Sequence, residues 1–106
     1  MANNYLLVYH GGGGMPETPE EGAKVLAAWN DWFGTLGDAV VDGGNPVTQV
    51  RTIGNNGTVS DGALNPATGY SIIKADSLDA AVALAKGSPI LNGGLGSVEV
   101  AEVTGM

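Results

Sequence analysis

The residue best suited to acid–base chemistry is the only histidine of the chain, His10. An imidazole exchanges protons near neutral pH when a carboxylate orients it. His10 directly follows the apolar run 5–9, and Asp42 and Asp61 follow later extended segments. Because the ends of strands border loops, we predict that His10 and Asp61 form a catalytic pair in a shared pocket, with Asp42 as a second possible partner. The alternative is an exposed histidine at the end of a strand.

Three further side chains are predicted to contact a ligand: Tyr9, Asp42 and Arg51. Arg51 is one of only four basic residues and could meet an anionic substrate or form a surface ion pair. Tyr9 shares a strand face with Tyr5 and Leu7, because side chains on one face recur at every second residue. The two tyrosines could therefore line a cavity between sheets or pack in a core.

Metal sites and thiol chemistry are not expected. His10, Asp42 and Asp61 lack the spacing of known metal-binding motifs. The chain has no cysteine, which excludes disulfides and thiolate ligands. We therefore predict neither a metal nor another cofactor.

Four glycines at 11–14 follow the first strand, as they do in phosphate-binding loops. The Gly-Lys-Ser/Thr sequence of such loops is missing, and Glu17, Glu20 and Glu21 surround the next helix start with negative charge. We expect a flexible loop here.

Composition indicates one globular domain spanning residues 1–106. The chain is 43% hydrophobic and 14% charged, which is too apolar for disorder. Four basic against eleven acidic residues give a net charge of −7, which disfavours nucleic acid and anionic membranes as partners. The apolar runs are too short to span a membrane, and the first residues lack the positive segment of a signal peptide. We expect a cytoplasmic protein that handles small molecules.

Capping residues predict two helices. The first has Thr18 as its N-cap, Pro19 at its first position and Glu21 completing a capping box, and it ends near Leu36 before Gly37. The second follows a strand within the stretch 69–86. It is capped by the Asp76-Ser77 pair and stopped by Gly87 and Pro89.

The first helix carries an apolar stripe formed by Val25, Trp29, Trp32 and Leu36. We expect the two tryptophans to make core or dimer contacts. The alternative is an aromatic wall for a planar ligand.

The predicted strands and helices alternate in the order β-α-β-hairpin-β-α-β. The strands are expected at 5–9, 39–42, 47–53, 58–60, 70–73 and 97–103, with a hairpin turn at Asn55-Asn56-Gly57. This order predicts an α+β sandwich of ferredoxin-like type with an extra hairpin. Two helices cover only one face of such a sheet, so we expect a homodimer through the other face.

Several segments in this order resemble the YCII-related family, in its DGPF-type branch. They are Tyr5–Tyr9, Ala28–Gly37, Val41–Gly44, Ser60–Gly62, Gly69–Ala85, Gly93–Gly94 and Ser97–Val100. The resemblance implies a dimeric α/β barrel with a cleft for small molecules. The name-giving Asp-Gly-Pro-Phe reads Asp61-Gly62-Ala63-Leu64 here, and the first-helix histidine of other YCII proteins is missing between 25 and 31.

Three functions follow from these observations. The chain is predicted to be a dimeric module that binds a small molecule without catalysis. The first alternative is a lyase or isomerase that uses His10 with an aspartate as an acid–base pair. The second is a structural or interaction dimer.

Overall fold

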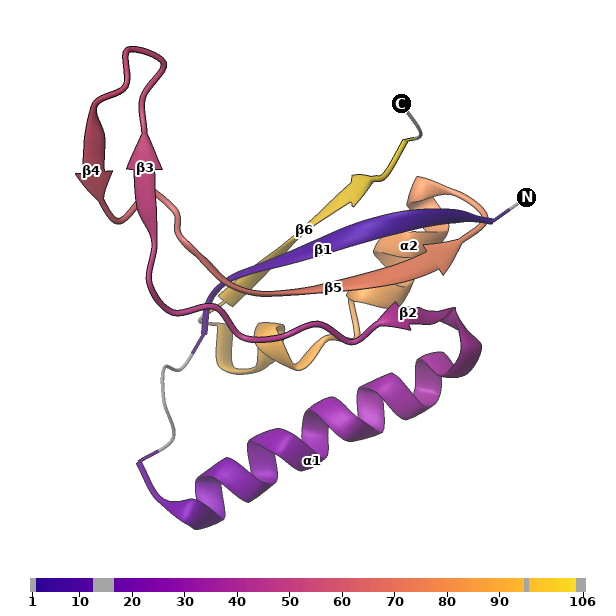
Figure 1. Ribbon diagram of the computed structural model, residues 1–106. Helices are drawn as coiled ribbons and strands as arrows, with labels where there is room; N and C mark the ends of the chain where they lie inside the picture. Colours follow the sequence, from indigo (N-terminus) through magenta and orange to yellow (C-terminus); the bar gives the residue numbers. More distant parts are fainter. Residues whose placement is uncertain (1, 13–16, 95, 105–106) are drawn as a thin grey trace.

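The computed structural model describes residues 2–12, 17–94 and 96–104 (Figure 1). They form an α+β fold, as predicted, with the elements β1 (Asn3–Gly11), α1 (Pro19–Leu36), β2 (Val40–Asp42), β3 (Arg51–Ile53), β4 (Val59–Asp61), β5 (Ala67–Ala75), α2 (Leu78–Ala85) and β6 (Gly96–Glu102). Two short 3-10 helices span Gly37–Ala39 and Pro89–Gly94. Gly13 and Gly14 of the predicted flexible loop lie outside the described residues.

Four strands form one antiparallel sheet in the order β2-β5-β1-β6, and β3 and β4 form a separate hairpin. This order is compatible with a ferredoxin-like α+β fold. β1 is paired along its length on both sides, with β5 and with β6. The sheet edges are therefore β2 and β6.

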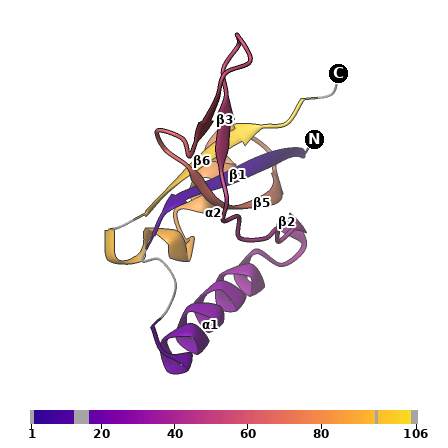
Figure 2. The same cartoon turned by 60° about the vertical axis from the view of Figure 1, so that its left-hand side comes forward.

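The alternation of side chains along β1 divides the sheet into two faces. Tyr5, Leu7 and Tyr9 are buried in the core with residues of both helices, among them Trp32 and Ala81. The residues between them in the sequence point to the other face, which we call the open face. Figures 1 and 2 show the β3–β4 hairpin projecting on the side of the sheet opposite α1.

Helix α1 is held to the sheet by aromatic side chains. Trp29 stands edge-on to Tyr9, with ring centroids 4.9 Å apart, and Phe33 packs beside both tryptophans. The Trp32 indole N–H donates to the carbonyl of Leu84, 3.2 Å away, which ties α1 to α2. The predicted role of the tryptophans in packing is confirmed.

The predicted apolar stripe is buried only in part. Val25 is 48% exposed and Leu26 is 62% exposed, so the first half of α1 carries apolar side chains into solvent. Helical spacing places these residues on one face of the helix but does not say whether another element lies beneath them. Neither α1 nor α2 combines the length and apolar character needed to cross a bilayer.

Both helix starts form as predicted. The Thr18 hydroxyl accepts from the Glu21 N–H at 3.1 Å, and the Ser77 hydroxyl accepts from the Ala80 N–H at 3.0 Å. Gly37 caps the end of α1 with a φ of 56°. The capping box differs in one detail, because the Glu21 carboxylate accepts from the N–H of Glu17.

The predicted extended segment 47–53 forms a strand only at Arg51–Ile53. Before it, Pro46 makes an isolated bridge with Gly69, and the Val47 N–H donates to the carbonyl of Thr68. The chain thus continues along the outer edge of β5 and then leaves the sheet. Proline has no N–H to donate, which limits regular pairing at this edge.

A close backbone contact holds this segment against β5. Gly44 has a φ of 76°, and a Cβ atom built there would lie 1.7 Å from the Tyr70 carbonyl oxygen. The N–H of Gly44 donates to the Asp42 carboxylate at 2.8 Å, which closes a tight turn. Only glycine fits this position.

We predict that Gly44→Ala lowers the free energy of unfolding by more than about 2 kcal/mol, because a steric overlap adds to the cost of a positive φ. Gly57→Ala is the matched control. Gly57 has a φ of 87°, but none of the described residues beyond its chain neighbours would come within 4 Å of an added Cβ. Its cost should therefore be about 1 kcal/mol. Chemical denaturation measures the free energy of unfolding of both variants. Equal losses in the two variants would contradict the close contact between Gly44 and Tyr70.

Candidate functional site

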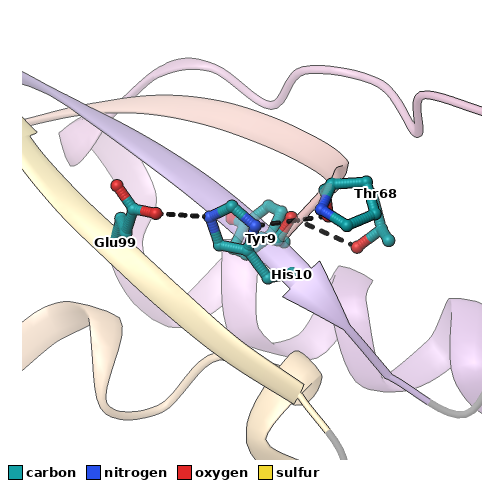
Figure 3. A network of polar contacts seen from close by, with 5 residues as sticks. Tyr9, His10, Thr68 and Glu99 are labelled. Carbon is teal, nitrogen blue, oxygen red and sulfur yellow. Dashed lines mark hydrogen bonds and ion pairs between the residues drawn. The ribbon is translucent and has the colours of Figure 1, made fainter. Parts of the chain in front are cut away.

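His10 lies at the end of β1 on the open face, between a backbone carbonyl and a carboxylate (Figure 3). Its Nδ1 is 3.2 Å from the carbonyl oxygen of Pro66. Its Nε2 is 2.6 Å from Glu99 Oε1, a close contact that lacks the geometry of a hydrogen bond. The imidazole is 8% exposed, whereas the Glu99 side chain is 66% exposed.

A β-bulge brings Pro66 to the imidazole. β1 and β5 pair regularly up to Tyr9 and Gly69, and His10 is then opposite Ala67, which leaves Thr68 as the extra residue. The Thr68 hydroxyl lies 3.2 Å from the carbonyl oxygens of Tyr9 and Gly11, which share its single proton. Bulges bend a strand and redirect its side chains.

The strand register places Glu99 in a row with two other side chains. Val8 is opposite Tyr70 on one side and Glu99 on the other, and directly opposed residues in an antiparallel sheet share a face. The Tyr70 hydroxyl lies 3.4 Å from the Asn45 amide nitrogen and accepts from it. The open face therefore has an apolar floor at Val8 with a phenol on one side and an exposed carboxylate on the other.

The occupied nitrogens of His10 decide what this group can do. A general base needs a ring nitrogen within hydrogen-bond reach of the proton that it removes. Nδ1 faces Pro66 and Nε2 faces Glu99, so neither nitrogen is directed at open space. Beside His10, the group that a bound molecule can reach is the exposed carboxylate of Glu99, which accepts hydrogen bonds.

The structure gives the two predicted catalytic residues different partners. Asp61 lies on the exposed β3–β4 hairpin, where its Oδ1 is 3.4 Å from Arg51 Nε. Both side chains line a shallow hollow with Gln49 and Val50, and His10 is not among the residues that line it. Among the described residues, the polar contacts of His10 are with Pro66 and Glu99.

Arg51, Asp42 and Tyr9 also have protein partners. Arg51 makes the surface ion pair that was one of its two predicted roles. Asp42 accepts from the Gly44 N–H. Tyr9 lies in the core, and its hydroxyl donates to Ser71 Oγ at 2.8 Å.

Glu99 and Tyr70 were missed as site residues. Tyr70 alternates with buried positions in β5 and Glu99 with half-buried ones in β6, a pattern that fits solvent exposure as well as a site. Their proximity to His10 and Val8 depends on strand pairing across the sheet. Within the described part of the chain, no group of three or more His, Asp or Glu side chains could hold a metal ion.

Comparison with known proteins leaves the family open, because no family model and no curated protein matches this chain. The resemblance to YCII-related proteins thus stays a prediction.

Tyr9 provides a test of the core beneath this site. Burial raises the pKa of its phenol above the usual 10.0, and the hydrogen bond with Ser71 lowers it by a smaller amount. The folded state therefore favours the neutral phenol. The contribution of Tyr9 to the free energy of unfolding is fully present below pH 10, where the tyrosine is neutral in the unfolded chain as well. It is lost as the pH rises through the folded-state pKa.

We predict that wild type is more stable than Tyr9→Phe by about 1 kcal/mol at about pH 8, the net value of one hydrogen bond. This difference should shrink above about pH 10, because ionisation of Tyr9 in the unfolded chain then favours unfolding of wild type alone. Urea denaturation of both proteins at several pH values measures the difference. A difference that grows with pH would contradict the raised pKa.

Proposed function

We propose that the chain is a cytoplasmic, YCII-related homodimer that binds a small molecule between two facing sheets, without catalysis. The observation that carries this proposal is the open face itself, where the exposed Glu99 carboxylate lies beside the apolar side chain of Val8. The proposed assembly is a dimeric α/β barrel of two ferredoxin-like protomers.

The exposed area of the chain supports a dimer. Its accessible surface is 7319 Å². A compact monomer of this mass exposes about 5,500 Å², so about 1,800 Å² is in excess. A stable interface of standard size buries about 800 Å² on each partner, which is less than this excess. The radius of gyration, 15.1 Å, likewise exceeds the value of about 13 Å for a compact domain of this length.

The open face has the chemistry of a sheet-to-sheet interface. Leu6, Val8 and Ile72 all lie on it, with Leu6 opposite Ile72 across the strand pair. All three are half-buried in the single chain. Stacked sheets lie about 10 Å apart, which leaves room for side chains and, where these are small, for a ligand. Apolar area left in water on this face favours its burial against a second copy.

The ligand that fits this site carries a hydrogen-bond donor on a small apolar body. Val8 offers an apolar surface, and Glu99 offers the acceptor. His10 contacts one carboxylate oxygen of Glu99, Oε1. We assign His10 a positioning role, because it is held between Pro66 and Glu99 and orients the acceptor that the ligand meets.

An acid–base lyase or isomerase is the second candidate, favoured by the 2.6 Å contact between His10 and Glu99. A histidine paired with a carboxylate is a common catalytic arrangement. In this case a substrate would have to displace Pro66 from Nδ1 or Glu99 from Nε2. Turnover of any bound compound that disappears in His10→Ala would favour the enzyme. If the protein is a dimer but binds no small molecule, the remaining candidate is a structural or interaction dimer.

We predict that Val8→Glu raises the dimer dissociation constant by at least about 100-fold, because each subunit would bring a second carboxylate into the interface directly opposite Glu99. Sedimentation velocity over a range of concentrations measures the constant, and circular dichroism checks the fold. Val25→Glu is the control, since Val25 is an exposed apolar residue of α1 away from the open face. Equal effects of the two variants would refute this interface.

Benzylamine, an aromatic ring with a charged donor, is a suitable probe for the site. We predict that Glu99→Gln weakens its binding about tenfold, the loss expected for one charge-assisted hydrogen bond. Glu102→Gln is the matched control. Glu102 lies on the same strand opposite Tyr5, on the other face, so its loss removes the same charge without touching the site. Calorimetric titration that finds the same affinity in both variants would contradict the assignment of Glu99.

A further inference from the structure

The β3–β4 hairpin, residues 51–61, forms an arm that stands apart from the sheet (Figures 1 and 2). All six of its strand residues are exposed. Ile53 and Val59 are directly opposite each other and are 71% and 57% exposed. Thr52 and Ser60 form the next pair, so one face of the arm is apolar near its tip and the other is polar.

The arm keeps a defined turn despite this exposure. The Gly54 N–H donates to the Thr58 carbonyl at 2.7 Å, and the Gly57 N–H donates to the carbonyl of Gly54 at 2.9 Å. Two-stranded hairpins alone are marginally stable in water and become stable when their apolar face packs on another element. The described part of the single chain gives Ile53 and Val59 no such element, because both remain exposed.

A complementary surface lies at the other edge of the sheet. Among the described strands, β6 pairs with β1 only, so its outer backbone groups are unpaired by the sheet. An apolar groove of about 410 Å³ lies beside this strand, between β6 and α2. Its lining includes Leu78, Val82, Leu91, Val98 and Val100, with Lys86 as a charged member. A regular unpaired edge invites pairing with another strand unless something covers it.

We propose that the arm of one chain packs along β6 of a second copy and sets Ile53 and Val59 over the groove at Leu78 and Val82. This inference rests on the proposed homodimer and names a second contact within it. Each chain supplies one arm and one groove, so a two-fold dimer forms the contact twice.

The position of the arm favours a second copy as the occupant. The arm projects on the open-face side, where the partner sheet would stack (Figure 2). From Arg51 to the turn it spans about five residues, or roughly 17 Å, which exceeds the spacing of about 10 Å between stacked sheets. Its tip therefore reaches past the partner sheet to the level of the partner's groove.

Sheet topology identifies which edge the arm meets. The edges are β2 and β6, and the chain leading to the arm continues from β2 along β5. When two such sheets close around a two-fold axis parallel to the strands, the β2 edge of each chain faces the β6 edge of the other. The arm is then carried to β6 of the second copy. The excess exposed area of about 1,800 Å² is large enough for both the facing sheets and the arms.

Cysteine cross-linking tests this contact directly, because the chain has no cysteine of its own. Two differently tagged chains, Ile53→Cys and Val82→Cys, are mixed and treated with a short bis-maleimide reagent. We expect the mixed dimer to be linked about 100-fold more efficiently than freely diffusing chains, since contact raises the effective concentration of the thiols. Mass spectrometry of the intact linked product identifies the two chains.

The matched control replaces Val82→Cys by Val25→Cys, which puts a thiol at a similarly exposed valine on α1. Suppose that wild type sediments as a dimer. If Ile53→Cys is then linked equally well to Val82→Cys and to Val25→Cys, or to neither of them, the inference is overturned. A wild type that stays monomeric would instead refute the proposed dimer, and the arm contact with it.

A second variant pair measures the energetic role of the arm. Ile53→Ser with Val59→Thr removes the apolar face of the hairpin and keeps residues that strands accept. We expect the dimer dissociation constant to rise at least about tenfold. Ser60→Thr alters the opposite face of the same hairpin and should leave the constant unchanged. An unchanged constant in the double variant would also overturn the inference.

Discussion

The two-sided pairing of β1 is the constraint on which the rest of the molecule depends. β5 and β6 both pair with β1 and come together only through it. Because side chains alternate along a strand, this pairing sends Tyr5, Leu7 and Tyr9 to the helices and leaves Val8 and His10 on the open face. Core and candidate site are thus two sides of one strand, and a shift of one residue in register would exchange them.

The helix side is held by a few large contacts. The ring of Tyr9 meets Trp29, while its hydroxyl donates to Ser71, whose own hydroxyl donates to the Gly43 carbonyl at 2.7 Å. Aromatic side chains bury much area with few residues, which allows a chain of 106 residues to form a core. The N-terminal half of α1 takes no part, since Val25 and Leu26 are exposed.

The open side combines three features. An exposed carboxylate lies against a buried histidine, beside apolar side chains, and a hairpin with two exposed apolar side chains, Ile53 and Val59, projects on the same side. The proposed homodimer around a small ligand would account for all of them together. The occupied nitrogens of His10 favour binding over catalysis, because the imidazole is already used to hold Glu99.

The sequence by itself determined the local structure of this protein. Thr18, Ser77 and Gly37 cap the helices as predicted, because a cap depends on residues within one turn of it. The hairpin turn at residues 55–57 and the α+β order follow from similarly local signals. Only the tertiary structure decided that His10 meets Glu99 and Pro66, that Tyr9 is in the core and that Val25 is exposed. Those outcomes depend on strand register and on which element lies over which, and contacts between distant segments set both.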